Sequence, residues 1–174
     1  DSLPIFSTFF PTRVFAGLPV ADSTPTDNRV PLVNNAIYTL KASHSGRCMT
    51  VSNASKAANA NVVQWACSNS TNQRWVALDA GSQYYRLKAQ HSNLCLQVAG
   101  VGSAQGAVLQ QAACVNNNSQ HWSLVKNADG TIRLTYRRSN MVADVEGRGT
   151  ANGPRLMQRR LENVPSMKWT VDRL

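Results

Sequence analysis

The chain has 174 residues, a charged fraction of only 16% and a formal net charge of +9. This length allows a single domain with a substantial core, and the low charged fraction favours a loop-rich β surface over helices covered with ion pairs. No run of 18 or more apolar residues occurs, which excludes a membrane-spanning helix. The first residue is Asp1, as expected of a mature form that has lost a signal peptide, or of an artificial start.

The positive charge is spread along the chain. Residues 1–34 carry a net −1, whereas 35–81, 82–128 and 129–174 carry +3, +3 and +4. Such a surface serves solubility or attracts anionic membranes, glycans or nucleic acid. The interleaving of stacking aromatics with arginines that is typical of nucleic-acid grooves is missing, so nucleic acid is not an expected partner. An acidic partner stays open for the last stretch, whose arginines include Arg137, Arg138, Arg148, Arg155, Arg159 and Arg160.

Residues 1–34 differ in composition from the rest and are interpreted as an extended N-terminal arm. All four Phe of the chain lie here, at Phe6, Phe9, Phe10 and Phe15, with five of its seven Pro. The proline spacing excludes a regular helix, and the aromatics argue against a plain solvated linker. The arm is therefore expected either to fold back onto its own domain or to dock on another chain.

Residues 35–174 contain three repeats, predicted as 35–81, 82–128 and 129–174. Trp75, Trp122 and Trp169 stand 47 residues apart, and the same offset relates further Cys, Leu, Val and His positions without a gap. Each unit contains short β-like segments separated by Ser, Asn and Gly, in the first unit at 38–42, 48–51, 62–65 and 74–78. Three such units give about twelve strands. Because a unit this small cannot bury its apolar face alone, the three must close around a shared axis.

The cysteines follow the repeat. Cys48 and Cys67 are separated by 19 residues, as are Cys95 and Cys114, and the third repeat replaces both partners, with Val142 and Leu161. Losing the two together is what paired residues predict, so disulfides Cys48–Cys67 and Cys95–Cys114 are expected. The alternative is a metal site, but CxxC and a nearby His cluster are missing from the sequence, and no metal or other cofactor is expected. Disulfides indicate an oxidising compartment and hence a secreted protein.

The ends of the repeats resemble a known family. Gln73-Arg74-Trp75, Gln120-His121-Trp122 and Met167-Lys168-Trp169 are similar to the Gln-x-Trp ending of the ricin B-type lectins, or family 13 carbohydrate-binding modules. The resemblance covers residues 35–174 and implies an all-β fold, a β-trefoil of three 47-residue repeats preceded by the arm. It implies that Trp75, Trp122 and Trp169 are core residues and not sugar contacts.

The resemblance also implies where sugar contacts lie: an acid two residues after the first Cys, an aromatic two before the second, and an Asn and Gln before the core Trp. An aromatic ring meets the apolar face of a sugar, and a charged acceptor fixes its hydroxyls. Every copy is incomplete. The first has Trp65, Asn72 and Gln73, with Thr50 at the acid position; the second has Gln97, Ala112, Ser119 and Gln120; the third has Asp144, Arg159, Ser166 and Met167.

Each of these sugar-site candidates has an alternative role. Trp65 is expected to be exposed, because Ala112 and Arg159 replace it in the other repeats. Asp144 is either a sugar acceptor or a turn residue. Asn72 and Gln73 are better explained as ordering the turn before Trp75, and Arg159 either recognises an acidic sugar or, as we favour, is solvated.

Catalytic motifs are missing from the sequence. Gly-x-Ser-x-Gly, HExxH and P-loop patterns do not occur, His44 and His91 occupy equivalent repeat positions as scaffold residues would, and no acid pair stands out. The chain is therefore predicted to be a secreted lectin module rather than an enzyme. It would attach a toxin or other effector to cell-surface glycans, with the arm docking on a catalytic or second lectin subunit, in outline like the cytolethal distending toxins. The alternatives are a trefoil that has lost sugar binding and acts as a docking subunit, and a module of a polysaccharide hydrolase.

Overall fold

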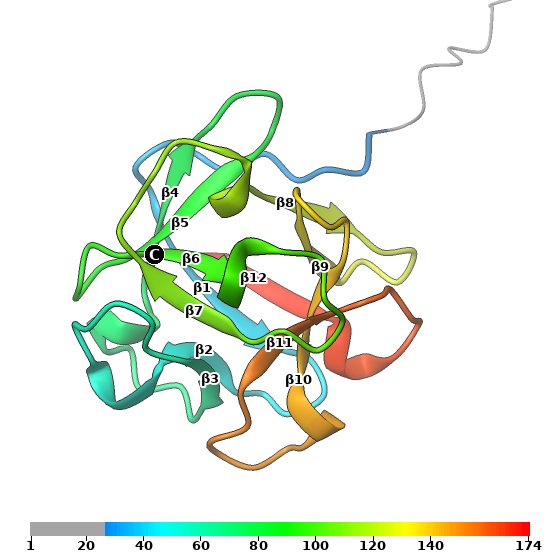
Figure 1. Ribbon diagram of the computed structural model, residues 1–174. Helices are drawn as coiled ribbons and strands as arrows, with labels where there is room; N and C mark the ends of the chain where they lie inside the picture. The colour runs from blue at the N-terminus through cyan, green and yellow to red at the C-terminus, as the bar shows by residue number, and fades with distance from the viewer. Residues whose placement is uncertain (1–26) are drawn as a thin grey trace, which may run out of the picture.

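The computed structural model describes residues 27–174 as an all-β domain (Figure 1). It has twelve strands, four to each repeat. In each repeat one short 3-10 turn follows the second strand and another precedes the fourth. The strands are β1 (Ile37–Ala42), β2 (Cys48–Val51), β3 (Val62–Trp65), β4 (Trp75–Asp79), β5 (Tyr85–Ala89), β6 (Cys95–Val98), β7 (Leu109–Ala112), β8 (Trp122–Lys126), β9 (Ile132–Tyr136), β10 (Val142–Val145), β11 (Leu156–Arg159) and β12 (Trp169–Arg173). The 3-10 turns are η1 (Ser52–Ala54), η2 (Thr71–Gln73), η3 (Ala99–Val101), η4 (Asn118–Gln120), η5 (Glu146–Arg148) and η6 (Pro165–Met167).

The pairing is that of a β-trefoil. Strands β1, β4, β5, β8, β9 and β12 pair antiparallel in a closed ring, since β12 returns to pair with both β9 and β1. The other six form the hairpins β2–β3, β6–β7 and β10–β11. Isolated bridges link these hairpins to one another, for example Val63 to Arg155 and Val108 to Met157. The predicted fold and strand positions are confirmed, with strand ends shifted by at most one residue in the first repeat.

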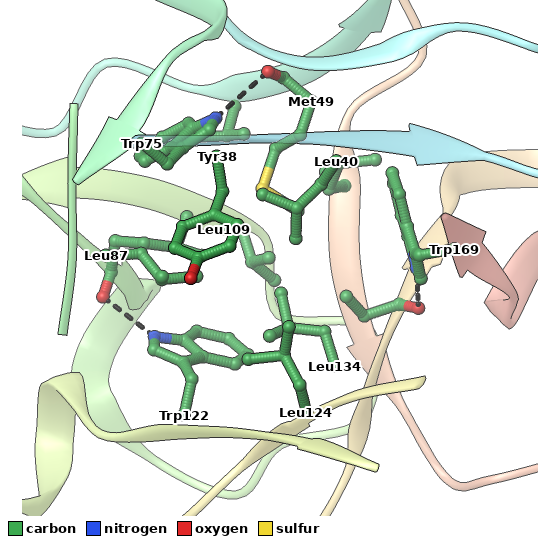
Figure 2. Packing of buried hydrophobic residues seen from close by; sticks show 14 of the residues in the cluster. Tyr38, Leu40, Met49, Trp75, Leu87, Leu109, Trp122, Leu124, Leu134 and Trp169 are labelled. Atoms are coloured by element: carbon green, nitrogen blue, oxygen red, sulfur yellow. Dashed lines mark hydrogen bonds between the residues drawn. The ribbon is translucent and has the colours of Figure 1, made fainter. Parts of the chain in front are cut away.

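The three repeated tryptophans form the centre of the core. Trp75, Trp122 and Trp169 are fully buried, and Figure 2 shows their indoles arranged around a cluster of leucines. Each indole Nε1 donates a hydrogen bond to a main-chain carbonyl of the second strand of its repeat, at 3.0–3.3 Å. Burying an indole requires a partner for its N–H. The repeat supplies that partner three times, which confirms these residues as structural anchors.

A ring of glutamines, which the sequence analysis did not single out, joins each repeat to another. Gln64, Gln111 and Gln158 are fully buried and again stand 47 residues apart. Each Nε2 donates to two main-chain carbonyls of another repeat: Gln64 to 149 and 151, Gln111 to 55 and 57, Gln158 to 102 and 104. Each Oε1 accepts from a serine hydroxyl of its own repeat. The three repeats are therefore closed by a cyclic set of polar contacts.

The histidines of the first two repeats support these contacts. The Nε2 atoms of His44 and His91 lie 2.8 and 2.7 Å from the carbonyls of Gly149 and Ser55, which also accept from Gln64 and Gln111. Both rings are thus part of the junction between repeats, in agreement with the expected scaffold role.

Both disulfides are formed. Cys48–Cys67 and Cys95–Cys114 have Cα–Cα distances of 5.1 and 5.0 Å, and residues 27–174 contain no free cysteine. In the third repeat Val142 is buried, whereas Leu161 has 52% of its surface exposed. The third repeat therefore lacks both the covalent link and a tight apolar contact at this place.

Residues 27–34, the part of the predicted arm that the structure describes, lie on the trefoil. Arg29 forms a bridge with Val125 of β8, and Val30 N–H donates to the carbonyl of Leu124 at 2.7 Å. Leu32 belongs to the core cluster, and its N–H donates to the hydroxyl of Tyr85. This segment folds back on its own domain. Phe6, Phe9, Phe10 and Phe15 lie outside the described residues, and the domain boundary at residue 34 stays a prediction.

Candidate functional site

The first repeat has an open pocket of about 310 Å³. It lies between η1, the end of β3 and the loop that leads into η2. Four of the sequence-predicted site residues meet here: Thr50, Trp65, Asn72 and Gln73. Asp144 and Arg159 do not belong to this pocket.

Trp65 forms one wall. Its side chain is at the end of β3 and 48% of its surface is exposed, as the replacements Ala112 and Arg159 in the other repeats predict. The strand is held by the third repeat, because the N–H groups of Gln64 and Ala66 donate to the Pro154 carbonyl and to Asn152 Oδ1. Gly153 lies beside the ring: its φ is +111°, and a Cβ there would be 4.0 Å from Trp65 Cζ3. Contacts with the third repeat therefore position the indole, while part of the ring stays exposed to solvent.

Thr50 and Gln73 are buried lining residues of the pocket that hydrogen-bond to each other and to the main chain. The Thr50 hydroxyl donates to the Cys48 carbonyl at 2.7 Å and accepts from Gln73 Nε2 at 3.1 Å. Gln73 also donates to the Ala66 carbonyl, and its Oε1 accepts from the Ser68 N–H. Both are buried. Gln73 thus orders the turn before Trp75, the role that the sequence analysis favoured for it.

Asn72 has one internal contact on each end of its amide. Its Nδ2 donates to the Val51 carbonyl at 3.0 Å, and its Oδ1 accepts from the Ser70 hydroxyl at 2.6 Å. The side chain is half-buried. It retains acceptor capacity at Oδ1 toward a ligand, since an amide oxygen accepts two hydrogen bonds.

Two polar residues of η1, Ser52 and Asn53, line the pocket and were missed by the sequence analysis. Among residues 27–174 neither side chain makes a hydrogen bond. A signal for Asn53 existed in the repeat: the equivalent positions are Gly100 and Gly147, and all three have positive φ, at 54°, 72° and 64°. A backbone position with positive φ favours glycine. The first repeat alone has an amide side chain at this position, which distinguishes it from the other two.

The pocket is uncharged. Within the described chain, none of its lining residues is Asp, Glu, Lys or Arg. The acid implied by the family resemblance is replaced by Thr50, whose hydroxyl is already engaged. This pocket can offer a flat apolar surface with hydroxyl and amide groups around it, but not a carboxylate.

The equivalent place in the second repeat lacks an aromatic wall. Gln120 Nε2 donates to Gln97 Oε1 at 3.0 Å, and its Oε1 accepts from the Val115 N–H. Ala112 provides no ring, and both Ser119 and Gln120 are buried. This copy repeats the internal network of the first without an aromatic wall.

In the third repeat Asp144 and Arg159 face each other. Asp144 is 1% exposed, its Oδ1 accepts from the Val145 N–H, and its Oδ2 lies 3.6 Å from Arg159 Nε. Arg159 therefore lies beside a buried carboxylate while 36% of its side chain stays exposed, so the expectation that it is solvated stays a prediction. Met167 takes the place of Gln73, and its Sδ accepts from the Glu162 N–H at 3.3 Å.

The described residues offer neither a metal centre nor a membrane helix. In residues 27–174 no group of three or more His, Cys, Asp or Glu side chains could hold a metal ion. Within the same range no helix has the length and apolarity needed to cross a bilayer.

Comparisons with known proteins place the chain among β-trefoil lectins. Residues 29–111 and, in a second overlapping match, 77–159 match the family described as ricin-type beta-trefoil lectin domain-like. A designed threefold-symmetric protein, ThreeFoil, is 35% identical with a TM-score of 0.77, over 79% of this chain and 99% of that one. No curated protein matches the chain.

Two natural structures share the fold at lower identity. An exo-β-1,3-galactanase from Clostridium thermocellum is 24% identical with a TM-score of 0.78, over 82% of this chain but only 31% of the galactanase. A ricin B-like lectin from Macrolepiota procera, solved with lactose, is 17% identical with a TM-score of 0.73, over 83% of this chain and 100% of the lectin. The family match covers most of the described trefoil, and ThreeFoil exceeds 30% identity over nearly its whole length. The chain therefore belongs to the ricin-type β-trefoil lectin domain-like family.

Proposed function

We propose that the chain is a secreted carbohydrate-binding module that attaches an effector, such as a toxin subunit, to cell-surface glycans. Its sugar site is the pocket of the first repeat. The observation that carries the proposal is Trp65, a half-exposed indole at the wall of an uncharged pocket rimmed by Ser52, Asn53 and Asn72. Two disulfides support secretion, because such bonds persist in oxidising compartments.

The chemistry of this pocket fits a neutral sugar. The face of an indole packs against the C–H groups of a pyranose ring, and hydroxyl and amide groups can exchange hydrogen bonds with its hydroxyls. The pocket lacks a charged acceptor, so its affinity depends on Trp65 more than it would in a site with an acid at position 50. A galactoside is the first ligand to test, because the Macrolepiota procera lectin was solved with lactose.

Two other functions each have one supporting observation. A module of a polysaccharide hydrolase is favoured by the galactanase, of which the chain matches 31%. A docking subunit without sugar binding is favoured by the second and third copies, which have Ala112 and Arg159 in place of the aromatic Trp65. In the docking alternative, and for any catalytic or second lectin subunit, the partner would contact residues 1–34.

The test is a glycan array with the purified chain beside Trp65→Ala, at low and at raised salt. Trp65→Phe retains a ring, and Val115→Ala removes an exposed apolar side chain far from the pocket in sequence, as matched controls. Selective binding of neutral glycans should be lost at least tenfold in Trp65→Ala, persist in part in Trp65→Phe and be unchanged in Val115→Ala. Binding that survives Trp65→Ala would contradict the proposed site, and no glycan binding at all would favour the docking function.

A further inference from the structure

A second pocket, of about 220 Å³, lies where the third repeat lacks its disulfide. Val142 and Leu161, which replace the two cysteines, both line it. Residues 27–34 reach it from one side through Arg29, and the turn between β4 and β5 contributes Tyr84. Strand β8 of the second repeat adds Ser123 and Val125. The pocket is therefore built from the third repeat together with three segments outside it.

Three guanidinium groups converge on this pocket without an acid. Arg29, Arg133 and Arg137 all line it, and within residues 27–174 no Asp or Glu does. Arg29 and Arg137 both stack on the ring of Tyr84, with Cζ atoms 4.6 and 4.1 Å from its centroid. At the positions of Arg133 and Arg137 the first repeat has Thr39 and Ser43, and the second has Arg86 and Gln90, so the third repeat alone has both arginines.

The arginines have mainly neutral partners. Arg133 donates to Asn127 Oδ1 at 2.9 Å, and Arg137 lies 3.2 Å from Nδ1 of His121. Burial, together with Arg137 and Arg86, lowers the pKa of His121, so the ring stays neutral and can accept this hydrogen bond. Within residues 27–174, Arg29 alone of the three has an acid nearby, Asp27 at 3.5 Å, and such a partly exposed pair is weak. Among the described residues the positive charge of the pocket is thus mostly uncompensated.

A buried hydroxyl adds a second signal. Thr135 lines the pocket with 8% of its surface exposed, and its Oγ1 has no hydrogen-bond partner within the described chain. An unsatisfied buried polar group costs about 1–3 kcal/mol and calls for an explanation. A ligand oxygen in the pocket would provide the missing partner.

We propose that this pocket is an acidic-sugar subsite, in which Arg133 and Arg137, with Arg29 and Thr135, hold the carboxylate or sulfate of a saccharide. Planar guanidinium groups recognise such anions by paired hydrogen bonds. A volume below the about 300–1,000 Å³ of typical ligand pockets suits one small acidic sugar rather than an extended chain. That the ligand is a saccharide rests on the proposed function; that it is an anion rests on the pocket alone.

The experiment is a protein-observed NMR titration with N-acetylneuraminic acid and with galactose 6-sulfate, using galactose as the neutral control. At least one acidic sugar should produce saturating shifts at the amides of Tyr84 and Thr135, and galactose should not. Arg133→Gln combined with Arg137→Gln should weaken this binding at least fivefold. The control combines Lys41→Gln with Lys56→Gln, two exposed cations outside the pocket, and should change affinity less than twofold.

A third variant, Thr135→Val, separates a loss of sugar binding from a loss of folding. It replaces the unpartnered hydroxyl by a methyl group, so the free protein should be at least as stable while the acidic sugar binds more weakly. The proposal is overturned if neither acidic sugar shifts these amides, if both variant pairs lose affinity equally, or if inorganic sulfate binds as tightly as the sugars. The Trp65 indole N–H reports the first-repeat site separately. Shifts at Trp65 without shifts at Thr135 refute the subsite and keep the proposed function. Acidic-sugar shifts at Thr135, with no neutral sugar bound at Trp65 here or on the array, keep the subsite and refute the proposed first-repeat site.

Discussion

At the residue scale, one position shows how the repeats keep a turn while changing its chemistry. Gln73 and Gln120 use the amide oxygen to accept from a loop N–H, and Met167 uses its sulfur to accept from the Glu162 N–H. In the first two copies the amide nitrogen also binds residue 50 or 97. Without that amide, Asp144 has only Arg159 beside its Oδ2. Met167 in place of a glutamine therefore leaves Asp144 without the amide contact that residues 50 and 97 have.

His121 predicts a pH dependence of stability. Its pKa lies below the ordinary 6.5 because the ring is buried and because Arg137 and Arg86 are close. The folded state therefore binds fewer protons than the unfolded state, and this contribution to stability is complete above about pH 6.5 and is lost as the pH falls through the folded pKa. The free energy of unfolding, measured in urea at several pH values, should fall more steeply below pH 6.5 in the natural chain than in His121→Asn. Parallel curves of unfolding free energy against pH would contradict this assignment. Because both chains contain His44 and His91, the difference between the curves reports His121 alone.

At the element scale, the strands could be predicted from the sequence because each repeat restates them. The 47-residue offset predicts the strand positions, the core tryptophans and the disulfides, because each of these features lies within one repeat. The polar contacts between repeats were missed, although Gln64, Gln111 and Gln158 share the same offset. A buried glutamine looks like a surface residue in sequence, and its partners are main-chain carbonyls in another repeat, which composition does not reveal.

The site was predictable only in part, for a similar reason. Trp65 was found because it departs from its equivalents, but Ser52 and Asn53 enter the pocket through η1, which the family resemblance does not mark. The arginine pocket depends on Arg29 reaching the third repeat from the N-terminal segment. No pattern within one repeat carries that information.

Removing one glutamine of the ring should cost more than any nearby polar change. Gln111→Ala removes three side-chain hydrogen bonds, those to the carbonyls of Ser55 and Ala57 and the one from the Ser92 hydroxyl, so we expect a loss of about 3 kcal/mol in the free energy of unfolding. Gln110→Ala, one residue away and on the other face of β7, should cost less than about 0.5 kcal/mol. Urea unfolding of both variants decides this, and equal losses would show that the ring does not hold the repeats together.

At the scale of the whole molecule, residues 28–33 add contacts to a trefoil that its repeats already close. Arg29 and Val30 lie along β8 as an added edge, and Leu32 and Val33 donate their N–H groups to the hydroxyls of Tyr85 and Tyr38, two equivalent residues of the first two repeats. The third equivalent is Ile132, which has no hydroxyl. The segment thus breaks the threefold symmetry and reaches both the core and the arginine pocket.

A pair of truncated chains tests this contribution. A chain that starts at residue 35 loses the burial of Leu32 and the hydrogen bonds of residues 28–33, whereas a chain that starts at residue 27 keeps them all. Burying a leucine and satisfying these groups is worth about 3 kcal/mol or more. For a domain of this size that corresponds to a fall in Tm of about 10 °C, measured by calorimetry. Leu32→Ala in the longer chain should account for about half or more of the fall. If the two truncated chains unfold at the same temperature, the segment lies on the trefoil without stabilising it, and Arg29 could then move away from the arginine pocket without cost to the fold.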